Sequence, residues 1–487
     1  MAALAIAALA GCEPQADRPV DTGIAEARRT VPLTTGSEEA RRQYVVGRDL
    51  FDKLRFHEAR KHFQFAVDAD PNFAIAHYHL ALSEATTKAF FDRLHRAMAL
   101  AEQASEGERL IINALHASAN ADPAKALSYY EQLVTAYPND AYAHFLLGFA
   151  VAGRQEFEKA IAEFTRATEL DPDYSPAWNA LGYAYRPLGR FDEAERAFKR
   201  YIQLIPKEPN PYDSYAELLL KTGRHEESIA MYRKALEADR HFVSAHVGIA
   251  SNLMYQGRHA EAQVELERLL AGARDNGERR TARLAMAVAY LDEGKPGAAI
   301  EQLATRYALG ERDGDAAAMA EDAALMGTVY LESGQPGRAL GQYRRALKIV
   351  EGSALSEEIK ADARLQHRAQ IARVALKQGD TAGARRAADA FAESAGNAQN
   401  PARDREAQEL VGLVALATGD YGGALTHLEQ ADRQDPYVLH AMARAYEGQG
   451  DAAKAREMYS IVATHNELPS LRYASVRRVA RGLAGSR

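Results

Sequence analysis

The arrangement in this chain that comes nearest to a catalytic motif is a pair of histidines, His57 and His62. They enclose Glu58 in the stretch His-Glu-Ala-Arg-Lys-His. A helix that binds zinc and activates water carries two histidines four positions apart with a glutamate between them. Here the histidines are five positions apart, so they diverge by about 140° around a helix and cannot share one metal ion. We expect both to be surface residues of a helix.

Other catalytic patterns are missing from the sequence. The fifteen histidines are scattered without the spacing of a metal site. The chain has no phosphate-binding loop, no Gly-x-Ser-x-Gly turn and no dinucleotide-binding fingerprint, and its single cysteine is Cys12. We therefore expect no catalytic residue, no metal site, no cofactor and no small-molecule substrate, and we interpret the protein as a non-enzyme.

The composition narrows the class of partner. Charged residues make up 26% of the chain, the net charge is −7, and no long block of charge is present. A protein that binds nucleic acid usually carries a basic footprint, which is absent here. No internal apolar run approaches the ~18–20 residues of a membrane-spanning helix. The body of the chain is therefore expected neither to bind nucleic acid nor to span a membrane.

A block of 34 residues repeats along the chain and defines the elements that must position any functional residue. The pairs at this interval are Gly148 and Gly182, Ala160 and Ala194, Phe164 and Phe198, and Pro172 and Pro206. The copy from Ser175 to Pro206 has two apolar stripes at helical spacing, separated by a break at Gly189. The first stripe is Trp178, Leu181, Gly182 and Tyr185, and the second is Ala194, Phe198 and Tyr201. The block predicts two helices that approach closely at Gly182 and Ala194.

These residues resemble the consensus of the tetratricopeptide repeat, in which Trp, Leu-Gly and Tyr are followed by Ala, Phe, Ala and Pro. Earlier and later copies show the same marks, for example Gly47, Ala59, Phe63, Ala66 and Pro71. After about residue 276 the interval stretches to about 37–45 residues, but an alanine still follows each turn glycine by five positions. These pairs are Gly294 and Ala299, Gly334 and Ala339, Gly379 and Ala384, Gly419 and Ala424, and Gly450 and Ala455. We interpret inserts such as 310–314 and 396–398 as longer loops between repeats.

The resemblance implies an all-α fold, a right-handed superhelical solenoid of helix pairs. We count roughly twelve repeats, a regular array over residues 37–276 and a looser array over 277–468. Residues 469–487 are expected to form a C-terminal capping helix, with Val476, Val479 and Ala480 on one face and its arginines elsewhere. The arginine side is expected to be solvated, and the alternative is a contact with an anionic lipid or partner.

The resemblance also places a candidate binding site. The first helix of each pair lines the concave face of such arrays, where peptides or partner helices bind. The outward-facing residues beside the buried stripes would then form a peptide groove; they are Tyr142, Phe145, Phe149, Asn179, Tyr183, Arg186, Asp213 and Glu217. The alternative is that the aromatic residues pack between neighbouring first helices.

The N-terminus resembles the signal of bacterial lipoproteins. Residues 1–10 are almost wholly apolar and are followed by Gly11 and Cys12, which resembles a lipobox in which the cysteine is lipidated after cleavage. Residues 1–11 would be the signal peptide and residues 12–36, with three prolines and no helical period, a flexible tether. No Lys or Arg precedes the apolar run, so we expect the natural start to lie further upstream. The alternative is an alanine-rich cytosolic N-terminus in which Cys12 occurs by chance.

The leading hypothesis is therefore a lipid-anchored scaffold that faces the periplasm, in the outer membrane, and binds protein partners for an envelope assembly or export machine. A second hypothesis is a cytoplasmic regulatory or sensory array that acts on a transcription or signalling protein. A third is an enzyme with an unrecognised C-terminal domain. The residues do not select the partner.

Overall fold

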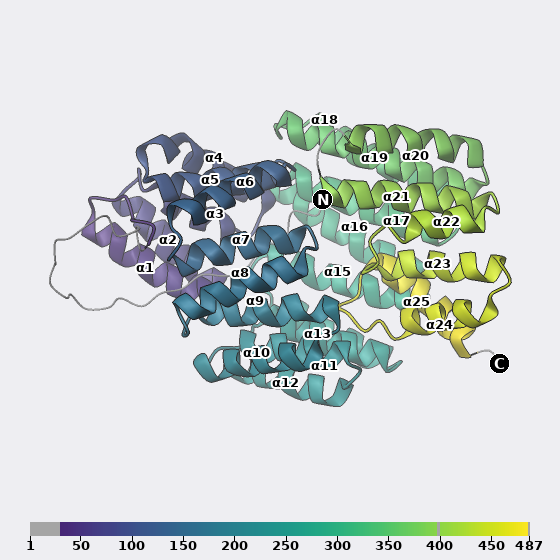
Figure 1. The fold of residues 1–487 in the computed structure, drawn as a ribbon, viewed down its shortest axis with the longest axis horizontal. Coiled ribbons are helices and arrows are strands. Elements are labelled where there is room, and N and C mark those ends of the chain that lie inside the picture. The colour runs from purple at the N-terminus through teal and green to yellow at the C-terminus, as the bar shows by residue number, and fades with distance from the viewer. Residues whose placement is uncertain (1–29, 397–399, 486–487) are drawn as a thin grey trace. The chain divides into compact units, whose positions relative to one another are not determined.

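The computed structural model describes residues 30–396 and 400–485, and within these ranges the chain forms helices and no strand (Figure 1). Two are short 3-10 helices, η1 (Ala101–Gln103) and η2 (Arg186–Leu188). The α-helices are α1 (Glu38–Asp52), α2 (Phe56–Ala69), α3 (Ala74–Leu82), α4 (Thr87–Leu100), α5 (Glu106–Ala119), α6 (Pro123–Ala136), α7 (Ala141–Gly153), α8 (Phe157–Leu170), α9 (Ser175–Tyr185), α10 (Phe191–Leu204), α11 (Asn210–Lys221), α12 (His225–Ala238), α13 (Val243–Tyr255), α14 (His259–Gly272), α15 (Asn276–Asp292), α16 (Pro296–Asp313), α17 (Ala316–Glu332), α18 (Pro336–Glu351), α19 (Glu357–Gln378), α20 (Thr381–Gly396), α21 (Pro401–Ala417), α22 (Tyr421–Leu428), α23 (Pro436–Gly448), α24 (Ala452–Ala463) and α25 (Leu471–Gly485).

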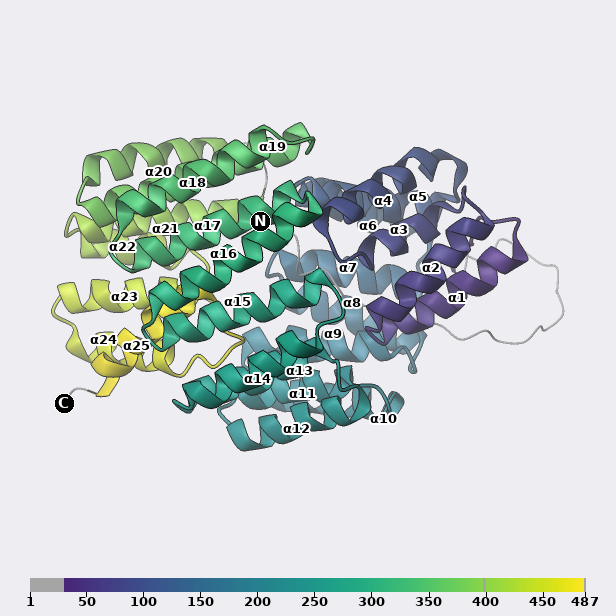
Figure 2. The same ribbon diagram turned by 180° about the vertical axis from the view of Figure 1, so that it is seen from behind.

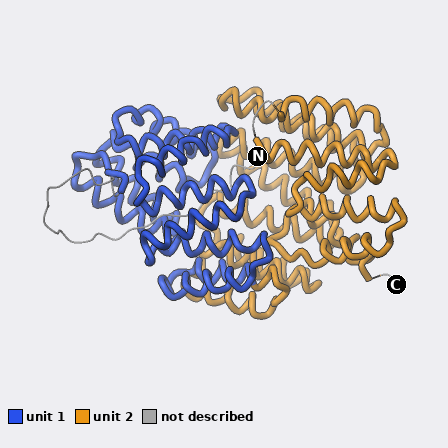
Figure 3. Tube along the Cα trace, in the orientation of Figure 1, with its two compact units in different colours: residues 1–218 blue, residues 219–487 orange. Residues whose placement is uncertain are grey.

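The predicted all-α solenoid of helix pairs is confirmed. Along the described chain, α1 to α24 follow one another as twelve successive pairs, and α25 comes after the last pair. The chain divides into two compact units, residues 1–218 and residues 219–487, with the boundary inside α11 (Figure 3). One hydrophobic core runs through the helix pairs of unit 1 from Ala40 to Ala197, and unit 2 holds several smaller core clusters.

Glycine permits the close approach of the two helices in a pair, as the repeat pattern predicts. A side-chain carbon added to Gly182 would lie 2.4 Å from the Phe198 ring, and one added to Gly148 would lie 2.4 Å from the Phe164 ring. Both phenylalanines are buried at this crossing. The glycine is therefore required because the aromatic ring of the second helix occupies the space of its missing side chain.

The turn inside every pair except α3 and α4 places one residue in the left-handed region. In the later pairs that residue is glycine, as at Gly294 with φ 85° and Gly450 with φ 82°. In three early pairs the same turn is made by Leu54, Ala121 and Gln155, with φ of 56°, 60° and 65°. Because these residues carry a Cβ, the early turns are strained relative to the glycine turns.

The prediction of longer loops at 310–314 was wrong. Residues 310–313 are the last residues of α16, which has 18 residues, and α19 has 22, whereas α7 and α8 have 13 and 14. The longer interval in this part of the chain therefore comes from longer helices. Gly396 likewise ends α20, and residues 397–399 lie outside the described residues.

Residues 31–35, which the sequence assigned to a flexible tether, run along unit 1 and bind its helix ends. The Val31 N–H donates to Asp140 Oδ2 at 2.7 Å, and the Thr35 hydroxyl donates to Asp70 Oδ2 at 2.5 Å. Between them, Thr34 Oγ1 accepts a hydrogen bond from the Ser105 N–H at 2.9 Å. We call residues 31–35 the strap. The predicted signal peptide, Cys12 and the tether as far as residue 29 lie outside the described residues.

The C-terminal helix differs from the predicted solvated cap. α25 packs against α24 and also against α15, α17 and α23 of unit 2, and it lies beside α15, α23 and α24 in both views (Figures 1 and 2). Its buried face includes Arg477, and Val479 of the predicted apolar face is exposed. The difference arises because acidic residues on other helices pair with the arginines.

Candidate functional site

The histidines that resemble a zinc motif have ordinary polar partners. His62 Nδ1 lies 2.8 Å from Gln43 Oε1 on α1, and His57 Nδ1 lies 3.2 Å from an Arg60 nitrogen. Among the described residues, no group of three His, Cys, Asp or Glu side chains lies close enough together to hold a metal ion.

The predicted groove residues all lie in unit 1, on first helices of successive pairs. Tyr142, Phe145 and Phe149 lie on α7, Asn179 and Tyr183 on α9, and Asp213 and Glu217 on α11, and Arg186 begins η2 directly after α9. We call this set the unit 1 strip. The structure brings its polar members together across α9 and α11.

One aromatic residue of the unit 1 strip, Phe145, belongs to the core, and Phe149 packs beside it. Phe145 is 1% exposed and packs against Phe164 and Tyr174, with ring centroids 6.0 and 5.4 Å away. Phe149 is partly buried, 5.3 Å from the Phe164 ring. Phe145 is therefore not available to a partner, and the packing alternative holds for it.

Tyr142 contacts Arg48, a residue that the sequence analysis did not predict as part of the site. The Arg48 guanidinium of α1 lies 4.3 Å from the centre of the Tyr142 ring. Arg48 also donates to His79 Nε2 at 2.8 Å, and His79 Nδ1 lies 3.1 Å from the Ile75 carbonyl oxygen. Because arginine only donates, Nε2 accepts and the proton sits on Nδ1. Burial and then Arg48 lower the pKa of His79 well below its ordinary value, which keeps the ring neutral.

Arg48 and Asp52 could have been found by aligning the copies of the repeat. Arg48 follows Gly47 as Phe149 follows Gly148, so it occupies a strip position in the first pair. Asp52, one turn further along α1, is 3% exposed and neither of its carboxylate oxygens has a hydrogen-bond partner. Burial raises the pKa of Asp52 well above its ordinary value, although Arg48 acts in the opposite direction.

Asn179 and Asp213 are buried polar residues with unused acceptors. They stand 34 positions apart, at matching points of α9 and α11, and are 3% and 4% exposed. Oδ1 of each has no hydrogen-bond partner. Burial and then the neighbouring Glu217 raise the pKa of Asp213 well above its ordinary value. The strip therefore contains two buried, unpaired acceptors at repeat spacing.

The other polar residues of the unit 1 strip pair with one another. An Arg186 nitrogen lies 2.9 Å from Glu217 Oε2, joining α9 to α11, and the guanidinium lies 5.0 Å from the centre of the Tyr183 ring. The Tyr183 hydroxyl donates to Ser214 Oγ at 3.5 Å. This network surrounds Asn179 and Asp213, and a group that donates N–H bonds reaches their buried acceptors only when the covering side chains move.

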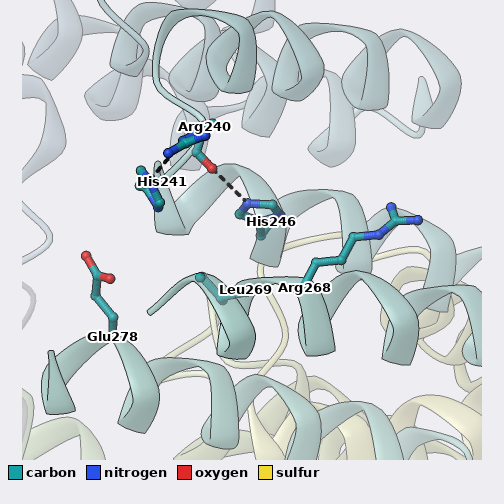
Figure 4. Close-up of a pocket in the computed structure, with 7 residues that line it drawn as sticks. Arg240, His241, His246, Arg268, Leu269 and Glu278 are labelled. Atoms are coloured by element: carbon teal, nitrogen blue, oxygen red, sulfur yellow. Dashed lines mark hydrogen bonds between the residues drawn. The ribbon is translucent and has the colours of Figure 1, made fainter. Parts of the chain in front are cut away.

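A pocket of about 240 Å³ in unit 2 looks ionic but is built from a structural motif of the repeat (Figure 4). Its His246 Nε2 donates to the Arg240 carbonyl at 3.3 Å, and Nδ1 lies 2.5 Å from Glu265. In unit 1, the Trp178 indole N–H donates in the same way to the carbonyl six residues earlier, that of Pro172, at 3.0 Å. The His246 ring and the Glu265 carboxylate are already paired with each other, so the pocket is a poor candidate for a binding site.

The pocket motif also occurs at His144. The ring lies 2.6 Å from Glu163 through Nδ1 and donates to the Pro138 carbonyl through Nε2 at 3.0 Å. Burial lowers the pKa of His144, but the hydrogen bonds to Glu163 and Pro138 outweigh it, so the pKa is raised overall. His144 on α7 thus stabilises the turn that precedes this helix by its hydrogen bond to the Pro138 carbonyl.

Among the described residues, no helix combines the length and the apolar character that a membrane span requires.

Comparison with known families supports the repeat assignment. A family model described as tetratricopeptide repeat matches residues 44–104, 113–175, 150–209 and 370–438, and a second model with the same description matches residues 219–283 and 415–475. Together these ranges cover well over half of the chain. Residues 284–369 fall between them, and there the helix pairs continue with longer helices.

Several solved structures are similar to parts of the chain. A crystal structure of MamA is 20% identical, covers 34% of this chain and 91% of its own, and has a TM-score of 0.29. YrrB, described as a TPR protein with an unusual peptide-binding site, is 17% identical with coverages of 37% and 91% and a TM-score of 0.26. A tetratricopeptide repeat protein from Parabacteroides merdae is 17% identical with coverages of 53% and 97% and a TM-score of 0.36. No curated protein matches the chain.

Proposed function

Because this chain belongs to the tetratricopeptide repeat family, a family of protein-interaction scaffolds, we propose that it is a lipid-anchored scaffold outside the cytoplasm that binds partner proteins through the first helices of unit 1. The partner belongs to an envelope assembly or export machine. It presents an extended segment whose N–H groups donate to the unit 1 strip.

One observation carries the binding part of this proposal. The buried acceptors of Asn179 and Asp213 have no partner within the fold, and a buried unpaired acceptor costs about 1–3 kcal/mol. Folding stability therefore does not explain them, whereas a bound segment that displaces the side chains covering them and then donates to them does. Their spacing of one repeat suits a ligand that runs along the array.

The test of the binding part replaces Asn179 by alanine. We expect Asn179→Ala to keep or slightly raise the melting temperature, because an unsatisfied acceptor is removed, and to reduce the capture of partners. The measurement combines thermal unfolding with crosslinked pull-downs from membranes, analysed by quantitative mass spectrometry against wild type.

Gln132→Ala serves as the control, since Gln132 is an exposed amide on the second helix α6 whose amide group contacts only Ser128. A loss of stability in Asn179→Ala, or an unchanged set of captured proteins, would show that Asn179 is a packing residue.

The location outside the cytoplasm is supported by the sequence Leu9-Ala10-Gly11-Cys12 after an apolar run. Export and lipidation at Cys12 would place the rest of the chain on one side of a membrane. Residues from Glu13 onward would then lead from the lipid to unit 1, where the strap begins.

Cys12→Ser tests the anchor. We expect this variant to leave the membrane fraction and to incorporate no labelled palmitate, because the lipidated thiol is gone. Wild type and Gly11→Ala, which keeps a small residue before the cysteine, should both stay in membranes. If wild type takes up no label and fractionates with the cytosol, the alternative of a cytoplasmic regulatory array replaces this one.

A further inference from the structure

Helix α25 packs across several helices of unit 2, as a bound ligand helix would. It comes last in the chain, yet it contacts α15 and α17 as well as its sequence neighbours α23 and α24 (Figure 2). Helices α15, α17 and α23, together with α21, are first helices of their pairs. We call the surface that these four helices present to α25 the unit 2 face.

Arg477 is the most deeply buried charge on α25. It is 3% exposed, and Nη1 donates to both carboxylate oxygens of Asp292 at 2.8 Å. Nη2 donates to the Tyr255 carbonyl at 3.1 Å, and the guanidinium lies 4.3 Å from the centre of the Tyr255 ring. The site therefore pairs the charge of the arginine and both of its terminal nitrogens and stacks its plane on a tyrosine, while the buried Nε has no hydrogen-bond partner.

Arg472 makes a second contact of the same kind, five positions earlier. Its guanidinium lies 2.6 Å from Glu409 on α21 and 3.0 Å from Asp435, the N-cap of α23, and 4.5 Å from the centre of the Tyr437 ring. Burial raises the pKa of Glu409, but Arg472 and Arg373 more than offset this effect. The pKa of the Glu409 carboxyl is therefore lower than its ordinary value, which favours the ionised form. Two acidic sites, each beside a tyrosine, thus receive two arginines.

Apolar contacts complete the fit of α25 to the unit 2 face. Leu471 and Ala474 join a core cluster that contains Met326 and Val329 of α17. The opposite side of the helix, with Arg478 and Arg481, is exposed. Arg477 therefore lies among apolar residues on the buried face of α25, and Arg472 lies at the edge of that face with 32% of its side chain exposed.

Asp292 and Glu409 of the unit 2 face keep a second partner when α25 is taken away, whereas Asp435 keeps only the backbone N–H that it caps. Asp292 also lies 2.9 Å from His259 Nε2, and Glu409 also lies 3.2 Å from an Arg373 nitrogen. Buried ion pairs cost desolvation that apolar packing would avoid, and their best-attested use is to fix register and choice of partner. A permanent cap needs neither the buried ion pairs nor the second partners of Asp292 and Glu409, whereas an exchangeable helix needs both.

We propose that the unit 2 face is a receptor site for a basic amphipathic helix with two arginines five positions apart, and that α25 occupies it until a partner helix of this kind replaces it. The proposal extends the proposed scaffold function to a second surface. It is independent of the unit 1 strip and of the anchor, because its test uses a defined peptide and no cellular partner.

The test opens the site by changing the helix and leaving the face intact. In the full chain, Arg472→Glu together with Arg477→Glu places carboxylates opposite Asp292, Glu409 and Asp435. A fluorescent peptide of residues 467–485 is then titrated against this variant and wild type, with binding followed by anisotropy. We expect the peptide to bind the variant at least about tenfold more tightly than wild type, where α25 competes.

Two controls sharpen the result. Arg478→Glu with Arg481→Glu makes the same charge change on the exposed side of α25 and should behave as wild type. A peptide with glutamate in place of Arg472 and Arg477 should not bind. If the double glutamate variant loses its helical circular dichroism, Arg472→Gln with Arg477→Gln is used in its place. A folded variant that does not bind the native peptide, or equal binding by all three proteins, would overturn the proposal.

Discussion

At the scale of single residues, the unit 1 strip contains polar groups that folding alone does not require. Asn179 and Asp213 of the strip, and Asp52 outside it on α1, are buried with unpaired acceptors, and burial raises the pKa of both carboxyl groups. Nearby, Arg186 and Glu217 show how the same strip satisfies a charge when it has a partner. Buried acceptors without a partner lower stability, and in our proposal their role is to bind a partner protein.

Asp213 gives a prediction for pH dependence. Its folded pKa lies above the value of about 3.9 for an unfolded aspartate, so the stability it contributes is present at acid pH and is lost as pH rises through the folded pKa. Asp213→Asn cannot ionise. We expect the melting temperature of this variant minus that of wild type to increase as pH is raised from 4 to 8.

The matched control is Asp173→Asn, at an exposed side chain, which should follow wild type at every pH. A difference for Asp213→Asn that stays constant, or shrinks as pH rises, would contradict the burial of a protonatable carboxyl.

At the scale of elements, the strap shows that the ends of the first helices can hold an extended segment. Asp70, Ser105 and Asp140 stand 35 positions apart; Ser105 and Asp140 are the N-caps of α5 and α7, and Asp70 is the C-cap of α2, shortly before α3. Asp140 uses Oδ1 to cap α7 through the N–H groups of residues 142 and 143, and Oδ2 to hold Val31. The same carboxylate thus stabilises a helix and binds a neighbouring chain segment.

Asp140→Asn separates these two roles. An asparagine caps a helix well but has one carbonyl oxygen, so it cannot also accept the Val31 N–H. We expect a loss of about 1–3 kcal/mol in unfolding free energy and faster amide hydrogen exchange over residues 31–35, with helix content unchanged. Asp122→Asn is the control, since that cap on α6 accepts only from the Lys125 N–H. Unchanged exchange in the strap would contradict the shared carboxylate.

Element patterns also show what the sequence could predict. The glycine, alanine and aromatic positions of each pair are local and periodic, so Gly182 against Phe198 followed from spacing alone. The pairing of Arg477 with Asp292 joins residues 185 positions apart, and an arginine on a helix ordinarily indicates a solvated face. Likewise Phe145 has the register of a groove residue, but the neighbouring Tyr174 covers it. Contacts between distant pairs are not visible in a repeat period.

At the scale of the whole molecule, the two units have different relations to a partner. Unit 1 holds unpaired acceptors on α9 and α11, and its strap connects it to the N-terminal segment that contains Cys12. The unit 2 face is already occupied by α25 through Arg472 and Arg477. On these two proposals, the scaffold would bind its first partner on unit 1, and its second surface would be available only to a helix that displaces α25.

The most direct test of this account is site-specific photocrosslinking in cells. A benzoylphenylalanine replaces Tyr183 in the unit 1 strip, or Phe65, which is 53% exposed on the second helix α2. The account predicts defined adducts of higher mass from position 183 and none from position 65. Adducts from position 65 alone, the same adducts from both positions, or none from position 183 would contradict the claim that the first helices of unit 1 bind the partner.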